Sequence, residues 1–133
     1  MRIGVAEFHN DIKGRLIFEV MGDKMLIKGE LMSDKMNGLY GCHIHKYGDQ
    51  NIEMLGGHYD KTNSDHPHHT GDLPNALFIN GVAFVSCIIN NVKLEQLYGR
   101  SVVIHKKCDD LKPEKNGHSG KIKDFAIIVR SDI

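Results

Sequence analysis

The apolar residues of this chain fall into short segments, and none of these segments keeps a helical period over three turns. β-branched and aromatic residues are frequent in them, and turn pairs such as Asn37-Gly38 and Asn80-Gly81 separate them. Such a pattern is typical of strands joined by tight turns. It predicts strands at residues 15–20, 24–32, 39–47, 76–79, 82–89, 101–106 and 122–130. Regularly spaced strands with glycine-rich turns favour an all-β sandwich or flattened barrel.

Two longer polar segments interrupt the strands. Residues 58–74 are rich in histidine and aspartate, and residues 107–121 are charged and contain Pro113. Long loops on a β scaffold are where binding and catalytic residues concentrate. We therefore expect both segments to be functional loops.

Composition limits the class of protein. The length of 133 residues suits a single domain spanning 1–133, and 17 basic residues balance 17 acidic ones. Zero net charge argues against a nucleic-acid partner, and the absence of a long apolar stretch argues against a membrane. The first ten residues carry no apolar core of a secretion signal, and the three cysteines form no closely spaced pair. A cytoplasmic location with reduced thiols is the simplest expectation.

Histidines are the most informative residues for function. His43 and His45 lie two apart in a predicted strand, so their imidazoles face the same side, about 6–7 Å apart at the backbone. His66, His69 and Asp72 are spaced three apart in the first loop, a spacing that suits wrapping around one cation. Imidazole and carboxylate are ligands for copper and zinc. Together with His58 and His105, these residues predict two adjacent metal sites.

Each cluster alone is weak support for a metal site. A His-x-His pair occurs by chance in many strands, and a histidine-rich loop is often only solvated. His68 neighbours two proposed ligands and stays an alternative to His66, whereas His9 and His118 are interpreted as surface residues. The combination of all the clusters is what favours specific metal binding.

Four blocks of the sequence resemble the copper-zinc superoxide dismutase family, in the family's order. Residues 38–49 (GLYGCHIHKYGD) resemble its copper-binding strand, and residues 56–60 (GGHYD) its bridging-histidine segment. Residues 69–75 (HTGDLPN) resemble its zinc loop, and residues 99–111 (GRSVVIHKKCDDL) its late copper-ligand segment. The resemblance implies a Greek-key β-sandwich or flattened barrel of about eight antiparallel strands with two long functional loops.

The resemblance also implies roles for particular residues. His43, His45, His58 and His105 would bind copper and form the catalytic centre. His58, His66, His69 and Asp72 would bind zinc, with His58 shared between the metals; its position eight residues after His58 favours His66 over His68. Asp109 would accept hydrogen bonds from one ligand histidine of each metal and so fix the orientation of both rings. The implied reaction is the dismutation of superoxide to oxygen and hydrogen peroxide, an antioxidant oxidoreductase activity.

Three departures from the family pattern bear on that activity. The family's intrasubunit disulfide has no counterpart, because residues 49–57 lack cysteine and Phe125 stands at the matching late position. Ile122 stands where the family has an arginine above the copper, so Lys121 and Lys123 are the candidates for substrate guidance, and Lys46 and Lys106 make the rim more positive. Both loops are shortened. Similarly trimmed members occur in large DNA viruses, and a viral source is therefore one expectation.

These observations predict a superoxide dismutase with copper and zinc cofactors and reduced activity. The alternative is a non-catalytic copper- or zinc-binding protein that sequesters metal or competes for a dismutase's partners, which the missing arginine and disulfide favour. The resemblance further implies a possible homodimer through the strand near Gly99 and the C-terminal strand, where Tyr47, Tyr98 and Ile127 offer an apolar contact. Arg130 argues against that interface.

Overall fold

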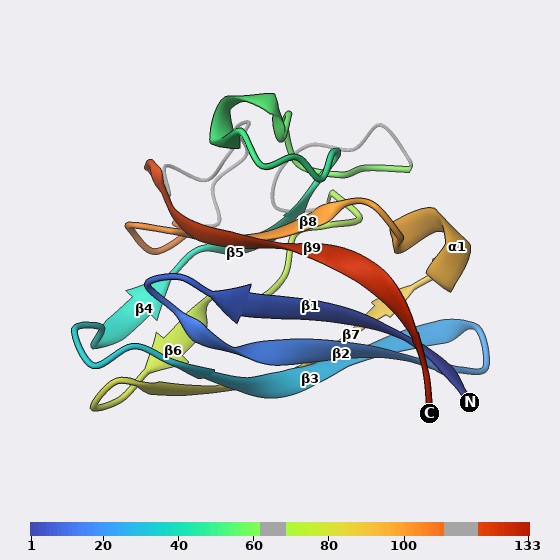
Figure 1. Ribbon diagram of the computed structural model, residues 1–133, viewed down its shortest axis with the longest axis horizontal. Coiled ribbons are helices and arrows are strands. Elements are labelled where there is room, and N and C mark those ends of the chain that lie inside the picture. The colour runs from blue at the N-terminus through green and yellow to red at the C-terminus, as the bar shows by residue number, and fades with distance from the viewer. Residues whose placement is uncertain (62–68, 111–119) are drawn as a thin grey trace.

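The chain folds almost entirely into antiparallel strands (Figure 1). A computed structural model describes residues 1–61, 69–110 and 120–133. Its strands are β1 (Arg2–His9), β2 (Lys13–Met21), β3 (Lys24–Met32), β4 (Gly38–Tyr40), β5 (Cys42–His45), β6 (Ala76–Phe78), β7 (Val82–Asn90), β8 (Ser101–His105) and β9 (Ile122–Asp132). Seven of them form one curled sheet in the order β5-β8-β9-β1-β2-β3-β7, and β4 pairs with β6. The predicted all-β architecture is confirmed.

Neighbouring strands in the sheet are often distant in sequence. β9 pairs with β1, β3 with β7 and β5 with β8, all antiparallel, as in Greek-key arrangements. The segment expected as one strand at 39–47 is divided at Gly41, because β4 pairs with β6 whereas β5 pairs with β8. The described strands therefore number nine rather than about eight.

One strand was missed from the sequence, and one turn was predicted well. β1 is buried at four successive positions, Ile3 to Ala6, so it lacks the alternation that identifies a half-exposed strand. The hairpin between β6 and β7 turns at Asn80 and Gly81, whose φ angles are 50° and 82°. Two positive φ angles define the turn type that an Asn-Gly pair favours.

The core lies inside the curled sheet. Leu16, Phe18 and Ile27 from the N-terminal hairpins are fully buried there, together with Ile104 from β8 and Ile128 from β9. All three cysteines lie in described segments and are free thiols: Cys42 is buried, Cys87 is partly buried and Cys108 is exposed. The fold therefore holds together without a disulfide across the described chain.

Short helices and loops occupy the ends of the strands. The 3-10 helix η1 spans Ile52–Met54 and the single-turn helix α1 spans Leu94–Leu97. The described parts of the predicted loops 58–74 and 107–121 contain no named strand or helix, and their central residues, 62–68 and 111–119, lie outside the described chain. Among the helices that are described, none has the length and apolar character needed to span a bilayer.

Candidate metal centre

Strand β5 places two imidazoles side by side. His43 and His45 point away from the core side of the strand, which Cys42 and Ile44 occupy, and both rings are buried. Their ring centroids lie 6.4 Å apart. The alternation expected for a strand is therefore present, and it directs both imidazoles to one place.

Two histidines from other segments join them. His58 follows the loop after η1 and forms an isolated bridge with His45, and His105 ends β8 at a register irregularity. The ring centroids of His58 and His43 lie 4.0 Å apart, and Nε2 of His45 lies 3.4 Å from Nε2 of His105. The four side chains form a group with one nitrogen of each within 4.8 Å of the others. We call this the four-histidine group.

Protein hydrogen bonds fix the orientation of three of these rings. Nε2 of His43 lies 2.8 Å from Oδ2 of Asp109. Nδ1 of His45 donates to the carbonyl oxygen of Gly56 at 2.8 Å, and Nδ1 of His105 donates to that of Gly120 at 3.0 Å. In each ring the opposite nitrogen is the one turned toward a metal position, which is the usual arrangement of metal-binding histidines.

A second group shares His58. Nδ1 of His58 lies 2.7 Å from Oδ1 of Asp72, and Nδ1 of His69 lies 2.9 Å from Oδ2 of the same carboxylate. These three side chains can offer two nitrogens and one oxygen to a cation, as zinc prefers. We call them the His-Asp group. His66 and its alternative His68 lie outside the described residues, so the choice between them stays a prediction.

Burial favours the neutral form of three rings in the four-histidine group, those of His43, His45 and His105. Loss of solvation, together with the neighbouring imidazoles, lowers the pKa of His43 to about 2 and that of His45 to about 4. Burial also lowers the pKa of His105, and its hydrogen bond to the Gly120 carbonyl partly opposes this effect. Neutral imidazole is the form that binds metals, so these three rings can bind a cation without first releasing a proton.

Asp109 is held in place by a residue that the sequence interpretation assigned no role. The Asn75 amide nitrogen donates to the Asp109 carbonyl at 3.0 Å, and the Asp109 backbone nitrogen donates to the Asn75 amide oxygen at 2.7 Å. Asn75 lay inside the zinc-loop block, but nothing in its spacing pointed to Asp109, 34 residues later. The second hydrogen bond expected for Asp109, to a histidine of the zinc site, stays a prediction.

An open pocket leads to the four-histidine group. It has a volume of about 640 Å³, and its walls include His45, His58 and His105 together with Lys106, Lys121 and Ile122. Lys123 lies elsewhere, with its Nζ 3.8 Å from Oδ2 of Asp11. Of the two lysines predicted to guide substrate, the structure therefore places Lys121 beside the histidines and Lys123 in another contact.

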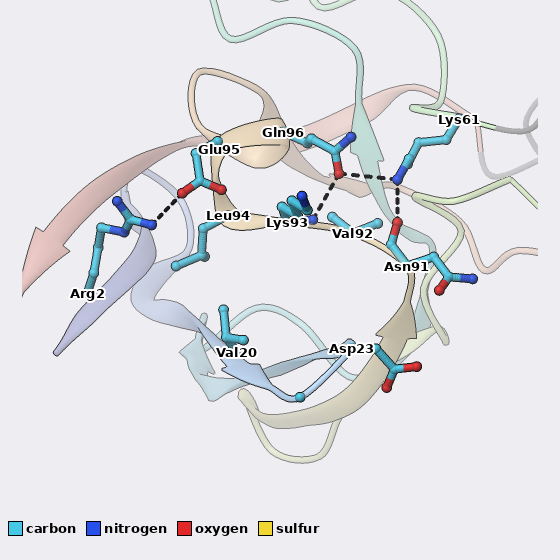
Figure 2. Close-up of a pocket in the computed structure, with 11 residues that line it drawn as sticks. Arg2, Val20, Asp23, Lys61, Asn91, Val92, Lys93, Leu94, Glu95 and Gln96 are labelled. Carbon is cyan, nitrogen blue, oxygen red and sulfur yellow. Dashed lines mark hydrogen bonds and ion pairs between the residues drawn. The ribbon is translucent and has the colours of Figure 1, made fainter.

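A second pocket lies apart from the histidines, between the β2–β3 turn and α1 (Figure 2). Its volume is about 590 Å³. Arg2 pairs with Glu95 on one side, and Lys61 contacts Gln96 on the other. Arg2, Glu95 and Lys61 are thus engaged with other protein atoms, and the described residues that could hold a metal ion lie in the histidine site rather than in this pocket.

Comparisons with known proteins agree with this geometry. A family model described as copper/zinc superoxide dismutase matches residues 12–128. A putative Cu-Zn superoxide dismutase of Autographa californica nuclear polyhedrosis virus is 33% identical over 116 residues, covering 76% of each chain. Cu-Zn superoxide dismutase A of Xenopus laevis is 32% identical over 113 residues, covering 76% of this chain and 74% of its own. An extracellular Cu-Zn superoxide dismutase of Brugia pahangi is 33% identical over 122 residues, covering 80% of this chain and 61% of its own. With a family model matching most of its length and a histidine cluster at the expected positions, this chain belongs to the copper/zinc superoxide dismutase family.

Proposed function

We propose that this protein is a superoxide dismutase with a copper site in the four-histidine group and a zinc site in the His-Asp group. The observation that carries the proposal is that His58 belongs to both groups. A ring with one nitrogen facing each group suits an imidazolate bridge, which requires two cations to offset the loss of both ring protons. His66 is proposed as the remaining zinc ligand.

The donor sets fit the two metals. Four buried imidazoles suit copper, and two imidazoles with one carboxylate suit zinc. Copper, when bound, supplies the one-electron oxidation and reduction by which two superoxide ions and two protons become oxygen and hydrogen peroxide. The protein's part is to orient the rings of His43, His45 and His105 through Asp109, Gly56 and Gly120, and burial favours the neutral form of these three rings.

His58 is placed to handle a proton. Because its Nδ1 faces Asp72 at 2.7 Å, its Nε2 is the atom directed toward the four-histidine group. In this proposal Nε2 of His58 takes up a proton in one half of the cycle and passes it to the departing peroxide in the other. Asp72 holds the ring in place from the opposite side.

Substrate guidance is assigned to lysines on the pocket wall. Superoxide is an anion, and positive charge in a cleft raises its local concentration. Lys121 and Lys106 line the pocket beside His45 and His105, whereas Ile122 contributes no charge there. We propose Lys121 and Lys106 for this role in place of Lys123, with activity below that of a member carrying a guanidinium at position 122.

The test is a superoxide decay assay on protein loaded with copper and zinc. Loaded wild type should accelerate decay, and His43→Ala should abolish the acceleration while Asn10→Ser, an exposed substitution, preserves it. If loaded wild type performs no better than His43→Ala, the enzymatic proposal fails.

The second candidate function is metal sequestration without catalysis. Ile122 on the pocket wall is the observation that favours it, because the described wall carries two lysines but no guanidinium to orient the anion. Tight stoichiometric copper binding with no turnover would select this function over dismutation.

A further inference from the structure

The pocket between the β2–β3 turn and α1 has an apolar floor (Figure 2). Val20, near the end of β2, is 51% exposed and lines this pocket together with the buried side chains of Val92 and Leu94. The volume of about 590 Å³ falls in the range of pockets that hold small organic molecules, which is about 300–1,000 Å³. An apolar floor with a few polar groups around it is the usual composition of such pockets. The pocket therefore has the size and the lining of a ligand site.

The ammonium group of Lys61 stands at the wall of this pocket and is held there by neutral oxygen atoms. Its Nζ donates to the Asn91 carbonyl and, at 3.2 Å, to Oε1 of Gln96. The Gln96 side chain is itself fixed, because the same Oε1 accepts a hydrogen bond from the Lys93 backbone nitrogen at 2.9 Å. An ammonium group has three donors, so one donor of Lys61 remains for a ligand. Because the group is already in place, binding an anion there costs little ordering of the side chain.

Positive charge is in excess in the lining of the pocket. Arg2 and Glu95 form an ion pair on the side opposite Lys61, so their charges offset each other (Figure 2). Lys93 adds a second positive charge, and Asp23 is the remaining acidic residue of the lining, with its carboxylate turned away from Lys61. Among the described residues, no carboxylate forms an ion pair with Lys61. Its charge is therefore fixed in position and not neutralised there.

A fixed cation beside an apolar floor favours one class of ligand. An inorganic anion would contact the ammonium group but leave the floor exposed to water. A neutral apolar molecule would cover the floor but gain nothing from the charge. A molecule that joins one anionic group to an apolar body gains from both.

We propose that this pocket binds a small amphipathic organic anion. Its carboxylate or other anionic group contacts Lys61, and its apolar body packs against Val20, Val92 and Leu94. The lining shares no residue with the pocket beside the four-histidine group, so the proposal does not rest on the proposed dismutase activity.

The test is a set of calorimetric titrations of protein loaded with copper and zinc. The probe is 2-naphthoate, which joins a carboxylate to an apolar ring system and should bind at one site per chain. Two further probes separate its parts: 2-naphthamide keeps the rings without the charge, and acetate keeps the carboxylate without the rings. Each of these should bind roughly 10-fold more weakly than 2-naphthoate, or weaker still.

Substitutions locate the probe in the pocket. Lys61→Gln should weaken 2-naphthoate binding by roughly 10-fold and leave 2-naphthamide binding unchanged, whereas Lys35→Gln, at an exposed lysine between β3 and β4, should change neither. Val20→Asn should weaken 2-naphthoate binding by roughly 5-fold, because the floor loses apolar surface. Val129→Asn, at a valine of similar exposure on β9, is the matched control and should have no effect.

Four results would overturn the proposal. They are the absence of saturable 2-naphthoate binding, equal affinities for 2-naphthoate and 2-naphthamide, wild-type affinity in Lys61→Gln, and loss of binding in Lys121→Gln, which would place the probe beside the histidines instead. The melting temperature of each variant checks that it remains folded. Should Lys61→Gln fail to fold, the comparison of 2-naphthoate with 2-naphthamide on wild type and the Val20→Asn variant still decide the matter.

Discussion

At the scale of single residues, the chemistry depends on the groups that hold the histidines as much as on the histidines. Asp109, Gly56 and Gly120 each engage the ring nitrogen that faces away from the shared centre. Two of these three are backbone carbonyls. The side chains at the metal centre therefore depend on loop conformation as well as on residue identity.

Replacing Asn75 should loosen Asp109. Asn75→Ala removes both hydrogen bonds to the Asp109 backbone, so the carboxylate loses its fixed position beside His43. We expect copper affinity to fall by roughly 10-fold or more, with an altered copper absorption and paramagnetic resonance spectrum. Asn10→Ser is the control, and Asn75→Asp, which keeps the acceptor oxygen, should lose less affinity. An unchanged spectrum and affinity in Asn75→Ala would show that Asp109 is held by other contacts.

Restoring a cation at position 122 should raise the rate. Ile122 lines the pocket beside Lys121, and a guanidinium there would attract and orient superoxide. Ile122→Arg should raise kcat/KM by roughly 10-fold at low salt, with the gain shrinking as ionic strength rises. Ile122→Gln, which is long and polar but uncharged, should give no such gain. Equal rates for the arginine and glutamine variants would show that charge at this position does not limit the reaction.

At the scale of elements, a side-chain network anchors the loop after β5. Arg100 donates through Nη1 to the Lys46 carbonyl at 2.8 Å and through Nε to the Gln96 carbonyl at 2.6 Å, with its guanidinium 3.9 Å from the Tyr59 ring centroid. The Ser101 hydroxyl donates to the Tyr47 carbonyl at 2.7 Å. These contacts tie the loop that carries Gly56 to β8, where no disulfide does so in the described chain.

Arg100→Lys should therefore weaken both the fold and the copper site. Lysine keeps the charge but lacks the planar fork that reaches two carbonyls at once. We expect about 1–3 kcal/mol less stability toward urea and lower copper affinity, because the Gly56 carbonyl that orients His45 moves with the loop. Arg130→Lys, on an exposed ion pair, is the matched control. A loss of stability without any change in copper binding would confine Arg100 to a structural role.

Sequence patterns were informative for strands and for which histidines the fold brings together, and weak for connections between distant segments. The alternation around His43 and the Asn80-Gly81 pair are local signals, and both gave the right geometry. The hydrogen bonds of Asn75 and Arg100 join segments that only the folded chain brings together. The separation of Lys121 from Lys123 likewise depends on where Asp11 lies in space. The zinc choice between His66 and His68 and the cytoplasmic location remain predictions.

At the scale of the whole molecule, buried neutral histidines link stability to pH. Folding lowers the pKa of His43 from 6.5 to about 2, so at this position only the unfolded chain gains a proton as the pH falls below 6.5. Above about pH 6.5 the buried neutral ring therefore costs no stability, and the free energy of unfolding decreases as the pH falls below that value. The same direction applies to His45, down to about pH 4, and to His105.

Metal-free protein should consequently lose stability steeply between pH 6.5 and pH 4. Each of these histidines adds about 1.4 kcal/mol per pH unit to the slope of the unfolding free energy. Urea titrations at several pH values measure that slope, and His105→Gln should make it shallower. A slope unchanged by His105→Gln would mean that this ring is protonated equally in the folded and unfolded states.

The most direct measurement is anomalous diffraction, at the copper and zinc absorption edges, from crystals of protein loaded with both metals. We expect a copper peak among His43, His45 and His105 and a zinc peak beside His69 and Asp72, with the His58 ring between them. A single peak, or a His58 ring contacting neither ion, would contradict the shared-histidine centre on which the proposed function rests.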